Sequence, residues 1–113
     1  MPPGLIYKLV SSLEWREAEV RGTFGGSSVD QRDGFIHFST AAQVRETAAR
    51  HFHGMNGLLI VAVRVEGLPL RWEPSRAGAL FPHLYQELPM TAVHWARPLE
   101  LGPDSQHRFP DLE

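Results

Sequence analysis

The chain has 113 residues, of which 42% are hydrophobic and 21% charged, with a formal net charge of -2 and no cysteine. These values predict one globular domain over residues 1–113 and exclude disulfides, thiolate nucleophiles and cysteine-rich metal sites. They also give no excess of positive charge that would favour binding to DNA. The absence of cysteine favours a location in the reducing cytoplasm.

The first third of the chain predicts a strand, a helix and a loop. Residues 5–10, LIYKLV, are rich in branched and aromatic side chains and predict a strand, and this N-terminus matches neither a signal peptide nor a membrane span. A helix is predicted over residues 12–21, where Ser11 and Glu14 form a capping-box pattern and Gly22 suits a left-handed end. The glycine, serine and aspartate density of residues 23–34 is typical of a loop.

The next stretch, FIHFS at residues 35–39, predicts a short strand that runs directly into a second helix. Thr40 and Gln43 repeat the capping-box pattern, and apolar residues recur at helical spacing over residues 41–52. Gly54 is expected to end this helix, which would be about a dozen residues long.

The second half of the chain predicts mainly strands. The apolar run at residues 58–63 is typical of a central strand, and residues 70–74 and 83–88 predict short strands at a sheet edge. Residues 92–101 predict a last strand, and residues 102–113 form a polar tail that we expect to be loosely held. The element order predicts an α+β fold with a split, mainly antiparallel sheet and two principal helices.

A first group of candidate site residues lies around His37. Alternation along the strand places His37 on the same face as Phe35 and Ser39, and the helix that begins after Thr40 offers free N–H groups to an anion. We therefore expect a neutral imidazole that hydrogen-bonds a ligand hydroxyl rather than pairing with a carboxylate. The alternative is that the two hydroxyls only cap the helix and that His37 bonds a backbone carbonyl.

A second group comes from residues 71–87. The guanidinium groups of Arg71 and Arg76 suit a phosphate or carboxylate, and Tyr85 beside His83 suits stacking on a planar base. A cleft for an anion needs donors from different elements, so we expect Arg71 or Arg76, together with His83, within reach of His37. The alternative is ordinary ion pairing and packing. The pattern HFH at residues 51–53 would separate its imidazoles on a helix, so no metal site is predicted.

The segments IYKLVSSLEWREAEVRGTF, DGFIHFSTAAQVRETAARHF, LRWEPSRAGALFPHLY and HRFP resemble the small, mostly bacterial family catalogued as domain of unknown function 952. The resemblance covers nearly the whole chain and implies a fold similar to the ADP-ribosyltransferase superfamily. In relatives of that superfamily a histidine on an early core strand contacts the ribose of NAD, and His37 resembles it. Tyr85 could resemble the aromatic residue that stacks on nicotinamide, and Glu87 the catalytic glutamate. The RNA 2′-phosphotransferase branch relies instead on arginines and histidines.

These patterns predict a cytoplasmic protein that binds NAD or another nucleotide or phosphate-bearing ligand, with neither DNA nor a membrane as partner. The cleft would be lined by His37, Ser39, Thr40, Arg71, Arg76, His83 and Tyr85. Candidate catalytic residues are His37, His83 and Glu87, for an NAD-dependent transferase or a phosphotransferase-like activity, although the residues leave turnover open. The alternative is a non-catalytic binding module for a small anion, a metabolite or a protein segment.

Overall fold

The computed structural model describes residues 4–112, apart from the side chain of Arg76. Within that range the helices are α1 (Ser12–Arg21), α2 (Ser28–Asp33) and α3 (Ala41–His51), with short 3-10 turns at Arg76–Gly78 and Met90–Ala92. The strands are β1 (Leu5–Ser11), β2 (Thr23–Phe24), β3 (Ile36–His37), β4 (Leu58–Arg64), β5 (Leu70–Pro74), β6 (Leu80–Leu84), β7 (Leu88–Pro89), β8 (Val93–Leu101) and β9 (His107–Arg108).

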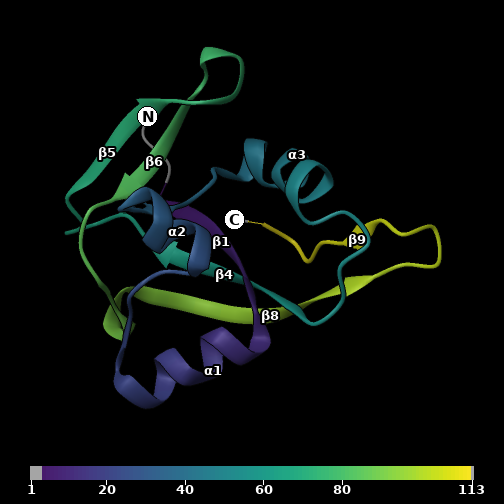
Figure 1. The fold of residues 1–113 in the computed structure, drawn as a ribbon, viewed down its shortest axis with the longest axis horizontal. Coiled ribbons are helices and arrows are strands. Elements are labelled where there is room, and N and C mark those ends of the chain that lie inside the picture. Colours follow the sequence, from purple (N-terminus) through teal and green to yellow (C-terminus); the bar gives the residue numbers. More distant parts are fainter. Residues whose placement is uncertain (1–3, 113) are drawn as a thin grey trace.

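The described strands form a split, antiparallel arrangement (Figure 1). The principal sheet has the order β1-β4-β8-β9, a second sheet has the order β3-β6-β5, and β2 pairs with β7. Strand β4 pairs with β1 on one side and with β8 on the other, as its continuous apolar sequence predicts. The α+β class and the mainly antiparallel sheet are therefore confirmed.

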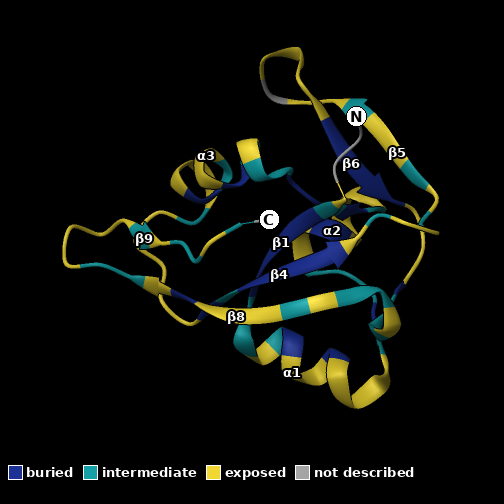
Figure 2. Cartoon of the chain, turned by 180° about the vertical axis from the view of Figure 1, so that it is seen from behind, coloured by how far each residue is buried: buried dark blue, intermediate teal, exposed yellow. Residues whose placement is uncertain are grey.

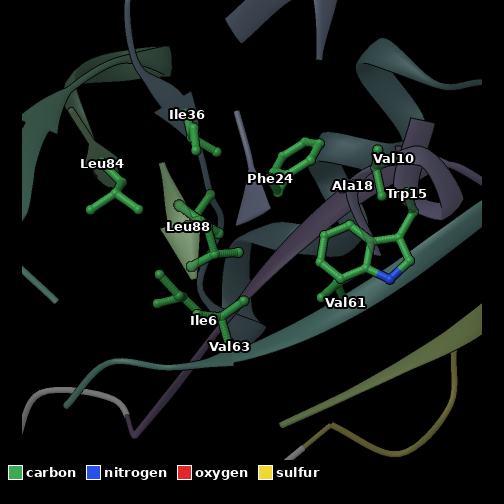
Figure 3. Close-up of a cluster of buried hydrophobic side chains, with 11 residues drawn as sticks. Ile6, Val10, Trp15, Ala18, Phe24, Ile36, Val61, Val63, Leu84 and Leu88 are labelled. Carbon is green, nitrogen blue, oxygen red and sulfur yellow. The ribbon is translucent and has the colours of Figure 1, made fainter. Parts of the chain in front are cut away.

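Strand β1 places apolar side chains on both faces of the principal sheet, because successive residues of a strand point in opposite directions. On the first face, Ile6 and Val10 pack with Trp15 and Ala18 of α1 (Figure 3). Residues of β3 and β6 close this core, so it joins the two sheets. This core also includes Phe24, Ile36, Phe38, Val61, Val63, Leu84 and Leu88.

On the second face, Tyr7 and Leu9 pack against Val44 and Ala48 of α3. The two longer helices thus cover opposite faces of the sheet, and strands β1 and β4 between them are almost wholly buried (Figure 2). None of the described helices is long and apolar enough to cross a membrane.

The helix ends follow the predicted capping patterns. The Glu14 N–H donates to Ser11 Oγ at 3.1 Å at the start of α1, and Gly22 ends that helix with φ of 90°. At the start of α3, the Thr40 N–H donates to Gln43 Oε1 at 3.0 Å. Helix α3 ends at His51, slightly before the predicted stop at Gly54.

Three predictions about local structure were wrong. Residues 23–34 were expected to be a loop, but they contain β2 and a third helix, α2. Residues 83–88 do not form one strand at a sheet edge, because β6 ends at Leu84 as the middle strand of its sheet and β7 begins at Leu88. The tail is not loosely held over its whole length: β9 pairs with β8, and Phe109 packs against the second core. Each difference arises from tertiary contacts that local composition does not reveal.

Candidate functional site

Helix α2 positions the acidic residues of the candidate site. Ser27 caps the helix, and its N–H donates to the Asp30 carboxylate at 2.9 Å, which completes a capping box. Gly34 ends the helix after only six residues with φ of 87°, and the chain then enters β3. The short helix therefore holds Asp30 and Asp33 directly before His37.

Asp30 forms an ion pair with Lys8 inside the protein. Lys8 Nζ lies 2.9 Å from Asp30 Oδ1 and 2.8 Å from Oδ2, and the two side chains are 6% and 1% exposed. Lys8 belongs to β1, where it shares a face with the apolar residues Ile6 and Val10. A charge in such a position needs a buried partner, and α2 supplies it.

The surroundings of Asp30 stabilise its ionised form. Burial alone would raise the pKa of Asp30, but the hydrogen bond from His37, the charge of Lys8 and the N–H of Ser27 outweigh burial and hold the pKa well below its ordinary value. Burial lowers the pKa of the Lys8 ammonium, against the opposing effect of the Asp30 carboxylate. Asp30 is therefore a carboxylate that accepts hydrogen bonds and does not donate one.

His37 pairs with carboxylates, which overturns the expectation that it would not. Its Nδ1 lies 2.6 Å from Asp30 Oδ1, and its backbone N–H donates to the same oxygen at 3.1 Å. Its Nε2 lies 3.0 Å from Asp33 Oδ2. The expectation failed because it considered only the helix that follows His37, whereas α2 precedes the strand and brings both carboxylates to the ring.

These contacts form a five-residue charge chain, in which basic and acidic side chains alternate. Its members, in order, are Lys8, Asp30, His37, Asp33 and Arg32. The hydrogen bond from Arg32 lowers the pKa of Asp33, with a further contribution from the charge of His37. The chain runs from a buried lysine to an arginine that is 72% exposed, so its positive outer end meets solvent.

The second sheet places His37, His83 and Arg71 next to one another in that order. His37 on β3 is opposite His83 on β6, and His83 is opposite Arg71 on β5. Residues that face each other across antiparallel strands project to the same side of the sheet. The two imidazole rings are 5.5 Å apart between centroids and meet nearly edge to face. His83 thus lies next to His37, and Arg71 lies one strand further away, on the other side of His83.

His83 is oriented by Glu73, a residue that the sequence did not single out as part of the site. His83 Nδ1 lies 2.7 Å from Glu73 Oε1, and the Tyr85 hydroxyl donates to the same oxygen at 2.7 Å. These hydrogen bonds, that of His83 foremost, lower the pKa of Glu73, while the bond to Glu73 raises the pKa of Tyr85. Among the described residues, none is placed within hydrogen-bond distance of His83 Nε2.

Phe35 packs against both histidines and Tyr85. Its ring centroid lies 4.5 Å from that of His37, 4.2 Å from that of His83 and 5.1 Å from that of Tyr85. The Arg71 guanidinium lies 5.2 Å from the centre of the Tyr85 ring. The aromatic side chains therefore hold the two imidazoles in place from one side.

A cavity of about 670 Å³ extends beside the two histidines. Every residue of the charge chain lines this cavity, and so does His83. Ser39 also lines it, although its hydroxyl lies 2.9 Å from that of Thr47 and its backbone pairs with Tyr7. The volume falls in the range of sites for nucleotides and other small ligands.

Other predicted site residues lie away from the cavity wall. Thr40, Arg71 and Tyr85 do not line the cavity, and the Arg76 side chain lies outside the described part of the structure. Glu87 does not line it either, and its carboxylate accepts a hydrogen bond from Thr23 at 2.9 Å. The structure thus brings together His37, Ser39 and His83 at the wall and sets Arg71 and Tyr85 behind His83.

Asp30 is the site residue that the sequence prediction missed most clearly. Two signals could have indicated it. The spacing Ser27-x-x-Asp30 is a capping-box pattern, and Lys8 is a charge within an otherwise apolar predicted strand. A lysine in that position predicts a buried acid elsewhere in the chain.

Comparison with known proteins identifies the family. The family model described as Protein of unknown function (DUF952) matches residues 9–96. The crystal structure of protein CC0527 from Caulobacter crescentus is 46% identical to this chain, with a TM-score of 0.87 over 92% of this chain and 93% of that chain. Its solution NMR structure is also 46% identical, with a TM-score of 0.83 over 92% and 91% of the two chains. No protein of curated function matches. From this match over most of its length, the chain belongs to the DUF952 family.

Proposed function

We propose that this protein binds a nucleotide or another phosphate-bearing ligand in the cavity beside His37 and His83, with NAD as the first ligand to test. The observation that supports this proposal most is the pair of imidazoles, 5.5 Å apart, at the wall of a cavity of about 670 Å³. Arg32 lines the same cavity, and its guanidinium suits the oxygens of a phosphate, whereas a ring nitrogen without a proton, such as Nε2 of His83, suits a ribose hydroxyl that donates to it.

Each aspartate at the cavity wall is paired with a cationic side chain. The acidic members of the charge chain each contact cationic partners, and the chain ends at the exposed guanidinium of Arg32. Arg71, which is opposite His83 on β5, adds a second guanidinium on the same side of the second sheet. A phosphate that enters the cavity would therefore meet Arg32 and two paired aspartates, with Glu14 as a further carboxylate on the wall.

A relationship to the ADP-ribosyltransferase fold is part of the same proposal. It is supported by the family resemblance, by the split antiparallel sheet and by the position of His37 on an early strand beside the cavity. The hydrogen bond between Thr23 and Glu87 gives no support for Glu87 as the catalytic glutamate of that superfamily. NAD binding is therefore proposed on the residues near His37 and His83, without a role for Glu87.

A second candidate is a non-catalytic binding module for a small anion, a metabolite or a protein segment. It is favoured by one observation: Asp30, Asp33 and Glu73 each already contact a lysine, arginine or histidine. No carboxylate of this group is left free to act on a sugar or to take up a proton. The cavity would then recognise its ligand without changing it.

A thermal-shift measurement with NAD, NADP, ADP-ribose and a 2′-phosphorylated RNA oligonucleotide tests the proposal. A ligand at a hundred times its Kd adds about 2.7 kcal/mol to the free energy of unfolding, which raises the Tm by about 10 °C in a domain of this size. We expect at least one of these ligands to raise the Tm of the parent protein. The rise should be smaller in Arg32→Ala and in His83→Ala. His53→Ala, at an exposed residue away from the cavity, is the matched control. No shift with any ligand at millimolar concentration would refute the proposed function.

A further inference from the structure

His83 and Glu73 have the arrangement of a base and the group that orients it. Glu73 is ionised and accepts hydrogen bonds, so the proton between Glu73 Oε1 and His83 Nδ1 belongs to the ring. A neutral imidazole with its proton on Nδ1 has a bare lone pair on Nε2. That atom has no hydrogen-bond partner among the described residues, and His83 borders the cavity although it is only 5% exposed.

Several groups around His83 fix this orientation. The Tyr85 hydroxyl donates to the oxygen of Glu73 that faces the ring, and Phe35 packs against the ring at 4.2 Å. Arg71 lies opposite His83 on the neighbouring strand, and His37 lies opposite it on the other. The ring is thus held at Nδ1 by Glu73 and against one face by Phe35, which leaves Nε2 as the ring nitrogen where a ligand can bind.

The surrounding charges favour a phosphate ester over a glycoside as the group acted on. Cleavage at a sugar carbon uses a free carboxylate to stabilise positive charge, and Asp30, Asp33 and Glu73 are all paired. Hydrolysis of a phosphate diester develops negative charge on phosphate oxygens, which cationic and N–H donors stabilise. Arg32, which lines the cavity and is largely exposed, is a cation of that kind.

We infer that His83 is the general base of a phosphodiester hydrolase site and that Glu73 is its positioning residue. The inference rests on the proposed function, because it assigns a reaction to the same cavity. His83 Nε2 takes a proton from a water molecule, whose oxygen forms a bond to phosphorus. The bond from phosphorus to the leaving oxygen breaks, and the electron pair stays on that oxygen. The proton on Nε2 then passes to the leaving oxygen, so the net reaction converts a diester and water into a monoester and an alcohol.

Hydrolysis of bis(4-nitrophenyl) phosphate by the full chain tests this inference. We expect release of 4-nitrophenolate that falls by about 100-fold or more in His83→Ala and in His83→Gln, since a general base contributes about 100- to 10,000-fold. The two variants are both used because one could fail to fold, and each is checked by its unfolding transition. His53→Ala should retain the rate of the parent protein, and the loss of rate in both His83 variants excludes a contaminating enzyme.

The role of Glu73 is tested by separating kcat from KM. Glu73→Gln should lower kcat by about 10-fold or more and leave KM within about 2-fold, because an amide no longer fixes the proton on Nδ1. Glu73→Asp, which keeps a carboxylate, should recover part of kcat. A purely structural role would change KM and the unfolding temperature together and would show no recovery with aspartate.

Three results would overturn the inference. If a nucleotide raises the Tm but the diester is not hydrolysed, the assigned reaction is wrong and the proposed binding function stands. If neither binding nor hydrolysis is observed, both are wrong. If hydrolysis persists at the parental rate in both His83 variants, the base lies elsewhere in the chain.

Discussion

His37 and His83 are neighbours across two strands, yet they occupy different chemical settings. Carboxylates contact both ring nitrogens of His37, Asp30 at 2.6 Å and Asp33 at 3.0 Å. A carboxylate contacts only Nδ1 of His83, and the structure describes no partner for its Nε2. A ligand could reach a nitrogen of His83 directly, but it would have to displace Asp33 to reach Nε2 of His37.

The difference follows from the elements that hold each ring. His37 follows α2, so both acids of that helix contact its ring, whereas His83 lies on the middle strand of a three-stranded sheet and its one carboxylate partner, Glu73, comes from β5. The first histidine therefore joins helix α2 to the sheet, and the second keeps one ring nitrogen without a partner among the described residues. Stability should depend more on the Asp30–His37 side, and ligand recognition more on His83.

The largest expected effect is at Asp30. Asp30→Asn should lower the free energy of unfolding by about 3–5 kcal/mol, because Lys8 would be left as a buried charge without a partner. Urea denaturation followed by fluorescence measures the change. The matched control is Asp104→Asn, which removes an exposed ion pair of 3.5 Å to Arg108 and should have little effect. Equal losses in the two variants would contradict the role assigned to Asp30.

Acidification should weaken the same interaction. The pKa of Asp30 is lower in the folded protein than in the unfolded chain, so its stabilisation is complete above the ordinary aspartate pKa of about 3.9 and is lost as pH falls below that value toward the folded pKa. We expect the stability difference between the parent protein and Asp30→Asn to shrink over this range. Denaturation curves from pH 7 to pH 2 measure it. A difference that stays constant down to pH 2 would show that the carboxylate charge is not the cause.

Truncation of each histidine sharpens the comparison. His37→Ala should lower the free energy of unfolding by about 1.5 kcal/mol, because Asp30 loses a charged hydrogen bond. For a ligand that raises the Tm of the parent protein, His83→Ala should weaken binding by about 10-fold, or about 1.4 kcal/mol. Isothermal titration and urea denaturation of both variants give the two values. If His37→Ala lowers affinity more than His83→Ala does, the assignment of roles is reversed.

The smallest expected effect is at the cap of α2. Ser27→Ala should reduce the free energy of unfolding by about 1 kcal/mol, since the Asp30 N–H loses its acceptor at the helix start. Ser27→Asp keeps an acceptor in that position and should restore most of the loss. Thermal unfolding of the two variants compares them. An alanine variant as stable as the parent would mean that α2 is held by Asp30 alone.

The sequence predicted those parts of the molecule whose pattern is local and long. The apolar run of β4 and the caps and periodicity of α1 and α3 are of this kind, and all three elements lie where they were expected. Helix α2 has six residues, and Val29, its one apolar side chain, is 48% exposed, so it has no periodic apolar face to detect. It is stabilised by its caps and by Lys8, which precedes Asp30 by 22 residues.

The candidate site was predictable in part for the same reason. Strand alternation correctly placed Phe35 beside His37 and the core residues on the other face. The pairings of His37 with Asp30 and of His83 with Glu73 depend on how separate elements pack, and no local pattern specifies them. The residue types were visible in the sequence, whereas their partners required the structure.

Ring-nitrogen NMR of the uniformly ¹⁵N-labelled protein tests most directly the claim that His83 presents a free nitrogen to the cavity. Long-range ¹H–¹⁵N correlations distinguish a protonated ring nitrogen from a bare one, and His83→Gln assigns the signals. We expect the neutral ring of His83 to carry its proton on Nδ1, beside Glu73, and to have a bare Nε2 whose shift changes when NAD or inorganic phosphate is added. A proton on Nε2 of the neutral ring, or an Nε2 shift that responds to neither ligand while that of His37 does, would contradict the account.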